Sequence, residues 1–162
     1  MDVFELIKRH EGFRAKVYTD TRGCTTIGYG FKVSAITAGD LDAIRPEPDR
    51  GPIDWPYFEL SEAEATIILS RKVRSLAGIL RINAWWAKLN DVRQAVMLDM
   101  AYNLGLDGLL AFHETLDSLR RGEWVAAARQ MLASEWAKEV GHRALEDAAL
   151  MAHGEWAVLA DR

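Results

Sequence analysis

The chain has 162 residues and a formal net charge of −4, from 20 basic and 24 acidic side chains. This length fits one domain that buries roughly 70% of the surface exposed by the unfolded chain, so stability requires neither a metal site nor a disulfide. The absence of a basic stripe argues against nucleic acid as the main partner, and the single cysteine, Cys24, excludes an internal disulfide.

The N-terminal residues carry no sign of a targeting or membrane segment. Residues 2–9 are too charged for a signal peptide. The longest apolar stretches are far shorter than the ~20 residues that span a bilayer. We therefore expect a soluble, cytoplasmic protein without a signal peptide, a signal-anchor helix or stable membrane insertion. We also expect a monomer.

The first 30 residues predict a short helix followed by a β-hairpin. Asp2 can cap the first turn of a helix over residues 2–11, and Gly12 can end that helix in the left-handed conformation. β-Forming residues at 15–19 and 24–29 flank a turn that contains a glycine, which predicts two antiparallel strands.

The rest of the chain changes from loop to helix at Ser61. Residues 34–58 hold all four prolines and predict loop and edge structure, with one helical turn near 39–44. A capping box at 61–64 opens a long helix, and residues 91–104 predict a helix that is apolar on several sides, as in the centre of a bundle. Four shorter helices are expected at 106–112, 114–121, 123–134 and 142–152.

The segment over residues 10–30 combines two acidic side chains with a predicted strand, one face of which has almost no bulky side chains. Glu11 ends the predicted helix, and Asp20 lies in the hairpin turn. A ligand could approach the backbone of the second strand closely, with the Thr26 hydroxyl directed at it. Because side chains alternate along a strand, we expect one face to hold Cys24, Thr26, Gly28 and Gly30.

Two carboxyl groups beside such a surface suit the cleavage of a glycosidic bond, which needs one proton donor and one ionised partner. The negative end of the helix dipole disfavours a second anion, which favours Glu11 as the donor. Asp20, in a turn with backbone amides nearby, more easily stays ionised. Most glutamates at helix ends and aspartates in turns are solvated surface residues, and this alternative stays open on the pattern alone.

The same segment resembles the phage-type lysozymes, or endolysins, of glycoside hydrolase family 24. Fainter similarity continues through Asn103-Leu104-Gly105, Gly122-Glu123-Trp124 and the closing segment, and only residues 31–58 match poorly. Three motifs of that family occur in order and with its spacing: Glu11-Gly12-Phe13-Arg14, Tyr18-Thr19-Asp20 and Thr26-Ile27-Gly28-Tyr29-Gly30.

The resemblance implies an α+β, lysozyme-like fold with a small N-terminal β lobe and a larger helical lobe joined by a long helix. We expect one domain over residues 1–162. Residues 13–60 would form the β lobe, residues 1–12 and 81–162 the helical lobe, and residues 61–80 the connecting helix.

The resemblance also implies a muramidase that hydrolyses the β-1,4 bond between N-acetylmuramic acid and N-acetylglucosamine in bacterial peptidoglycan. Glu11 would be the general acid, and Asp20 and Thr26 would position the attacking water, with inversion at the sugar. Arg143 would pair with Glu11. The residues expected to contact the substrate are Gly30, Lys32, Tyr102, Asn103 and Arg143.

No cofactor and no metal are expected, since His113, His142 and His153 do not share a metal-ligand spacing. The enzyme would stay in the host cytoplasm until a separate, holin-like pore releases it to the cell wall. The pI near 5.6 predicts weak electrostatic capture of an anionic wall.

Several side chains raise more local expectations. Phe31 stands where the family often has a histidine, so we expect an apolar contact there. Asp99 lies inside the apolar helix and should need a partner. We expect core positions for Trp124, Trp136 and Trp156, whereas a core position and a sugar contact both stay open for Trp55, Trp85 and Trp86.

Two alternative functions remain at this stage. One is a thiol hydrolase built on Cys24 and His10. The other is a lysozyme-like domain that binds the cell wall or a partner without catalysis. The joint presence of Glu11, Asp20 and Thr26 favours the enzyme, because a domain that only binds has no chemical need for all three.

Overall fold

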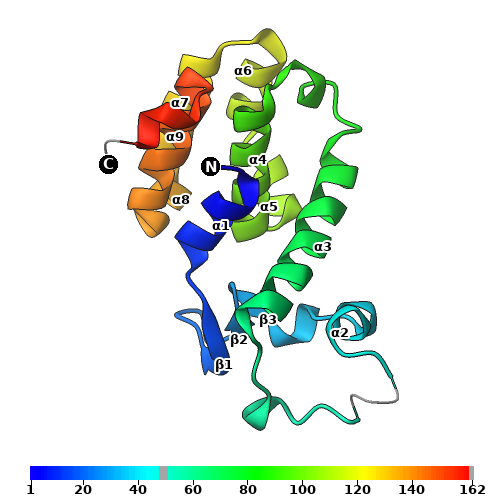
Figure 1. Cartoon of the computed structure of the whole chain (residues 1–162). Helices are drawn as coiled ribbons and strands as arrows, with labels where there is room; N and C mark the ends of the chain where they lie inside the picture. The colour runs from blue at the N-terminus through cyan, green and yellow to red at the C-terminus, as the bar shows by residue number, and fades with distance from the viewer. Residues whose placement is uncertain (48–50, 161–162) are drawn as a thin grey trace. The chain divides into compact units, whose positions relative to one another are not determined.

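The structure is a computed structural model that describes residues 1–47 and 51–160 (Figure 1). Residues 48–50, which belong to the predicted loop at 34–58, and residues 161–162 lie outside the described residues. The structure is mostly helical, with one small antiparallel sheet near the N-terminus, and it confirms the prediction of an α+β fold.

The chain divides into two compact units. The small unit is Ile7–Arg74, and the helical unit consists of Met1–Leu6 and Ser75–Arg162. Two helices continue from one unit into the other: α1 (Val3–Glu11) and α3 (Glu62–Leu80).

The sheet of the small unit has the strand order β1-β2-β3 (Figure 1). β1 (Arg14–Thr19) and β2 (Thr25–Gly28) form the predicted hairpin. β3 (Phe31–Lys32) was not predicted, because two residues are too few to show an alternating pattern. The short third strand places Lys32 opposite Thr26 of β2.

The predicted position of Gly30 on the face of the second strand is wrong. β2 ends at Gly28, and Gly30 lies in the turn that leads into β3. Gly28 and Gly30 both adopt left-handed backbone conformations, with φ of +66° and +72°. These conformations reverse the chain and end the alternation on which the prediction relied.

Two capping boxes fix the helices of the small unit. The Thr37 hydroxyl accepts from the Asp40 N–H and caps α2 (Ala38–Ile44), and the Asp40 carboxylate accepts from the Thr37 N–H. This helix confirms the predicted helical turn. Ser61 and Glu64 form the capping box predicted for the start of α3.

Six α-helices follow in the described part of the helical unit. α4 (Asp91–Leu104) has the predicted bounds, and its central residues from Ala95 to Ala101 are all buried. The other helices of this unit are α5 (Leu106–Leu110), α6 (His113–Arg121), α7 (Trp124–Leu132), α8 (Glu135–Val140) and α9 (His142–His153). α9 packs against α4, α7 and α8, and α6 packs against α7. α8 was not predicted, because its six residues are too few for a helical period.

The tryptophans divide between the core and partly covered sites. Trp85, Trp86 and Trp136 are buried, which places the first two in the core. Trp124 and Trp156 are only half-buried, so the prediction of core positions is confirmed for Trp136 alone among the three predicted.

Arg93 holds Trp124 and the end of α9 together. Its guanidinium stacks over the Trp124 ring at 4.6 Å and donates to the carbonyl groups of Met151 and Ala152. A Cβ atom at Gly154 would lie 2.6–2.8 Å from the Arg93 guanidinium and would displace it. The φ of +72° at Gly154 also favours glycine.

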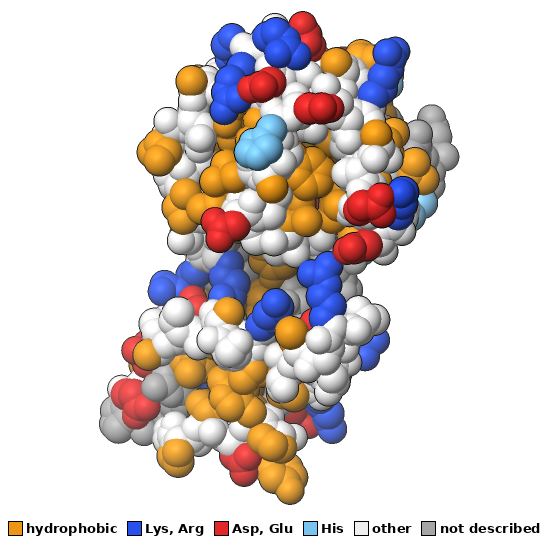
Figure 2. Space-filling view, turned by 180° about the vertical axis from the view of Figure 1, so that it is seen from behind, with side chains coloured by type: hydrophobic (Ala, Val, Ile, Leu, Met, Phe, Trp, Pro, Cys, Tyr) orange, Lys and Arg blue, Asp and Glu red, His pale blue; other side chains and the backbone are white. Residues whose placement is uncertain are grey.

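One face of the helical unit is seen in Figure 2. Hydrophobic side chains gather in the middle of this face, with acidic and basic side chains around them. Among the described residues, every helix falls short of the length or the apolar character that a membrane span requires.

An ion pair joins α2 to the start of α3. Arg45 donates from Nε to Glu64 Oε1 at 2.6 Å and from Nη2 to Glu64 Oε2 at 3.1 Å. The Arg45 guanidinium, together with the capping contacts of Ser61, lowers the pKa of Glu64 from 4.5 to about 2. The folded small unit therefore favours the ionised form of Glu64.

We expect Glu64→Gln to lower the free energy of unfolding at neutral pH by about 1–2 kcal/mol, a value reduced for the partial exposure of Arg45. Because the folded pKa lies below the unfolded one, the stability from this pair is complete above about pH 4.5 and is lost as the pH falls towards 2. Urea unfolding between these limits measures the difference, with exposed Glu155→Gln as the control. A difference that does not change with pH would contradict the assignment.

Candidate active site

The Glu11 carboxylate lies against the backbone of the β2–β3 turn. Glu11 is the last residue of α1, and Gly12 turns the chain towards β1 with φ of +66°. A Cβ atom at Gly30 would lie 2.4 Å from Glu11 Oε2, far closer than a carbon and an oxygen can approach. Glycine at position 30 is therefore a condition for this position of the carboxylate.

Asp20 occupies the turn between β1 and β2, where backbone amides fix its orientation. Its Oδ1 accepts from the N–H groups of Arg22 at 2.9 Å and Cys24 at 2.7 Å. The Asp20 N–H donates to the Cys24 carbonyl, and the Gly23 N–H donates to the Asp20 carbonyl. One oxygen of the carboxylate is thus held by the turn itself.

Thr26 lies in the middle of the sheet and is buried, with 2% of its surface exposed. It is paired with Tyr18 on β1 and with Lys32 on β3, so three side chains form a row across the sheet. The Thr26 hydroxyl donates its proton to the Cys24 carbonyl at 3.0 Å. Its oxygen is left as a hydrogen-bond acceptor.

Tyr18 lies within electrostatic reach of both candidate carboxylates. Burial raises the pKa of the Tyr18 phenol, and the negative charges of Glu11 and Asp20 raise it further, whereas Arg14 lowers it. The Arg14 guanidinium lies 4.5 Å from the centre of the Tyr18 ring. The small unit therefore gathers Glu11 and Asp20 around one phenol.

Tyr18 was not among the predicted site residues. Its place in the Tyr18-Thr19-Asp20 motif was the available signal, but a motif does not show which way a side chain points. Its pairing with Thr26 follows from the strand register, which only the folded hairpin defines.

The remaining predicted site residues belong to the helical unit. Tyr102 and Asn103 lie in the last turn of α4, and Asn103 Oδ1 accepts from Trp136 Nε1 at 2.9 Å. The predicted contacts of Tyr102 and Asn103 with a substrate, and the predicted pairing of Arg143 with Glu11, stay predictions.

Arg143 and Asp99 form a buried ion pair inside the helical unit. Arg143 donates from Nε to Asp99 Oδ2 at 2.8 Å and from Nη2 to Asp99 Oδ1 at 2.9 Å. The side chain of Asp99 is fully buried, and that of Arg143 is 8% exposed. The prediction that Asp99 needs a partner is confirmed, because a buried carboxylate is tolerated only when it is paired.

A second carboxyl group, Asp147, is buried beside this pair. Burial raises the pKa of Asp147 well above its usual range, and the neighbouring negative charge of Asp99 acts in the same direction. In the ionised form, neither carboxylate oxygen of Asp147 has a hydrogen-bond partner among the described residues. Once protonated, Asp147 can donate to Asp99, because a carboxylic acid carries one O–H donor.

Comparison with known proteins identifies the family. Residues 8–152 match the phage lysozyme family. The chain belongs to this family. Membership indicates a lysozyme-like glycoside hydrolase, and the matched region includes every residue of the predicted site.

Two relatives show how widely the sequence pattern is shared. The chain is 27% identical over 151 residues to the pre-baseplate central spike protein Gp5 of Enterobacteria phage T4. That match covers 89% of this chain but 26% of the spike protein, so the chain spans about a quarter of that relative. It is also 24% identical over 147 residues to the probable T4-type lysozyme 1 of Dictyostelium discoideum, with 86% of each protein covered.

The structure also tests the apolar contact expected at Phe31. Phe31 is buried, with 2% exposed, and its ring meets that of Tyr29 edge-on at 6.4 Å. A Cβ atom at Gly28 would lie 2.6 Å from the Phe31 ring. The expected apolar contact is confirmed, and it depends on glycine at position 28.

We expect Glu11→Gln and Asp20→Asn each to lower the pKa of Tyr18. Removing a nearby negative charge makes the phenolate less unfavourable. NMR titration of ring-labelled tyrosine measures the pKa, and Tyr18→Phe identifies the signal. An unchanged pKa in both variants would show that the carboxylates do not surround this phenol, and exposed Glu5→Gln is the control.

We expect Asp147→Asn to raise the free energy of unfolding at neutral pH by about 1–3 kcal/mol, because the amide removes a buried carboxyl that resists ionisation. The folded pKa of Asp147 is raised, so the stability that its neutral form contributes is complete below about pH 3.8 and is lost as the pH rises. The gain should therefore vanish at low pH. Thermal unfolding across this range tests it against the exposed control Asp107→Asn, and a gain that persists in acid would be evidence against it.

Proposed function

We propose that the chain is a muramidase that hydrolyses the β-1,4 bond between N-acetylmuramic acid and N-acetylglucosamine in bacterial peptidoglycan. The family match over residues 8–152 supports this activity. One observation carries the assignment of residues. The negative charges of Glu11 and Asp20 both raise the pKa of the Tyr18 phenol, on the edge strand β1. Paired carboxyl groups are the general requirement of glycoside hydrolysis.

In this proposal Glu11 donates a proton to the leaving oxygen of the glycosidic bond. Its contact with the backbone of Gly30 leaves no side chain of residue 30 between the carboxyl group and a ligand. Such a fixed position matters because general acid catalysis requires the donor within hydrogen-bond distance of the oxygen that it protonates.

Asp20 and Thr26 would position the attacking water. The Thr26 hydroxyl already donates to the Cys24 carbonyl, so towards water its oxygen can act as an acceptor. An ionised Asp20 also offers only acceptors. A water molecule that donates one proton to each would direct a lone pair at the anomeric carbon, as an inverting hydrolysis requires.

Five further residues are proposed to contact the substrate. Lys32 is exposed at the end of the row that contains Thr26, where it can reach a sugar hydroxyl or carboxylate. The full set is Gly30, Lys32, Tyr102, Asn103 and Arg143. We further propose that the enzyme reaches the wall from the host cytoplasm through a separate, holin-like pore and causes lysis.

Loss of turbidity of purified peptidoglycan tests the activity. We expect Glu11→Gln to lower the rate by about 10²–10⁴-fold, because general acid catalysis contributes about this much. Product analysis should give a new reducing end on N-acetylmuramic acid, and the anomeric form of that end reports inversion.

Two controls sharpen this test. Cys24→Ser should retain full activity, since the proposed chemistry does not use the thiol, and a loss would favour the thiol hydrolase. Circular dichroism should show Glu11→Gln folded. Equal activity of the wild type and Glu11→Gln would rule out the proposed mechanism.

A non-catalytic role is the second candidate, and the similarity to a spike protein favours it. In that relative, the matched region is 26% of a larger protein whose name describes a structural spike. Co-sedimentation with peptidoglycan separates the two functions. A wild-type protein that sediments with the wall and releases no reducing ends would support the binding domain.

A further inference from the structure

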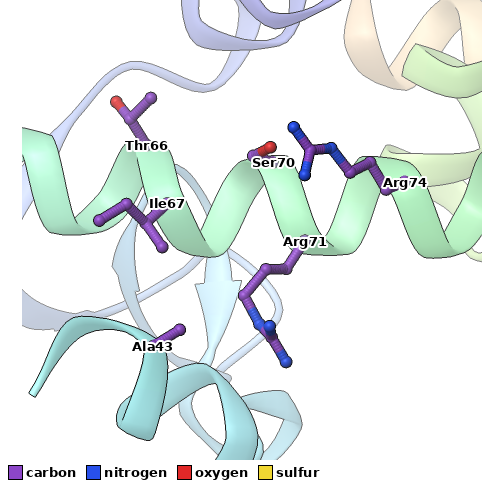
Figure 3. A pocket seen from close by; sticks show the side chains of 6 residues that line it. All are labelled: Ala43, Thr66, Ile67, Ser70, Arg71 and Arg74. Atoms are coloured by element: carbon purple, nitrogen blue, oxygen red, sulfur yellow. The ribbon is translucent and has the colours of Figure 1, made fainter. Parts of the chain in front are cut away.

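A pocket of about 470 Å³ lies on the side of α3 that faces α2, within the small unit (Figure 3). Its volume falls in the range of sites that bind small ligands. It contains none of the residues of the candidate active site. The lining residues are Ala43 of α2 and Thr66, Ile67, Ser70, Arg71 and Arg74 of α3.

Arg71 is held in place by α2. Its Nε donates to Asp40 Oδ1 at 2.9 Å, and the Asp40 carboxylate is itself buried. A Cβ atom at Gly39 would lie 3.2 Å from Arg71 Nη2, so the guanidinium lies close to the first turn of α2. The anchor uses Nε, and the Nη groups are the donors available to a ligand.

Arg74 supplies a second guanidinium. No hydrogen bond or ion pair engages its side chain in the part of the chain that the structure describes. Figure 3 shows this side chain directed back towards Ser70, one helical turn earlier. The pocket lining therefore carries two positive charges and no carboxylate, although the chain has a net charge of −4.

The remaining lining residues favour a peptide over a simple anion. The Thr66 hydroxyl donates to the Glu62 carbonyl at 2.8 Å, which leaves its oxygen as an acceptor for a ligand N–H. Ile67 is 42% exposed and, with Ala43, offers an apolar wall. Guanidinium groups suit carboxylates through paired hydrogen bonds. An acidic peptide with a small aliphatic side chain matches all three features, whereas inorganic phosphate uses only the donors.

We infer that this pocket binds a carboxylate of a short acidic peptide, of the kind that the peptide part of peptidoglycan provides. The choice of a wall peptide rests on the proposed function, whereas the pocket and its charge do not. Binding there would hold the wall polymer at a second point, on residues that take no part in the hydrolysis.

Titration with a sugar-free stem peptide, released from peptidoglycan by an amidase, tests this inference by NMR. We expect the backbone amide signals of Thr66, Ile67 and Ser70 to shift. Arg74→Gln should weaken binding about tenfold, as expected for the loss of a charge-assisted hydrogen bond. The matched variant Arg129→Gln, at an exposed position of α7, should bind as the wild type does. The same peptide with esterified carboxyl groups should not bind.

Three results would overturn the inference: no shift of these amide signals, equal binding by Arg74→Gln, or equal binding of the esterified peptide. Inorganic phosphate or a phosphate polymer that binds as tightly as the peptide would also overturn it, because the pocket would then be a general anion site. Hydrolysis of peptide-free glycan strands, measured in parallel, reports on the proposed function alone. Active enzyme without peptide binding rejects only this pocket, and peptide binding without hydrolysis rejects only the muramidase.

Discussion

The close approach of the Glu11 carboxylate to the backbone of Gly30 is the constraint on which the small unit's candidate site depends. A Cβ atom at residue 30 would overlap the carboxylate oxygen, so the contact exists only with glycine. The same turn requires a left-handed backbone at Gly28, where the Phe31 ring fills the space of the missing side chain. The turn between β2 and β3 thus positions Glu11 at the end of α1 and brings β3 back alongside β2.

The carboxylates of the candidate site are less buried than two carboxyl groups inside the helical unit. In the small unit, the candidate carboxylates stay half-buried, and backbone amides orient Asp20. In the helical unit, Asp99 is fully buried, and each of its carboxylate oxygens accepts a hydrogen bond from Arg143. A second buried acid, Asp147, has no hydrogen-bond partner for its carboxylate oxygens among the described residues, and burial favours its protonated form. The unfavourable burial of a carboxylate is therefore offset at Asp99 by pairing with Arg143, and it is avoided at Asp147 by protonation.

Local sequence signals predicted most helices and the hairpin. A capping residue such as Ser61 contacts only residues close to it in the sequence. A helical period likewise repeats within one stretch of the chain, so both signals can be recognised without the fold. The strand β3 and the helix α8 are too short to show a period and were missed. The face of Gly30 was predicted wrongly, because the alternation rule assumes that a strand continues where the chain in fact turns.

The sequence by itself determined the α+β class, the family motifs and the need for a partner at Asp99, because each depends on residue type and spacing along the chain. The tertiary structure decided that Arg143 is that partner. It also decided that the charges of both Glu11 and Asp20 act on the Tyr18 phenol, and that Tyr18 is paired with Thr26 across the hairpin. These contacts join residues from separate elements, and their geometry is set by strand register and helix packing, which no local pattern encodes.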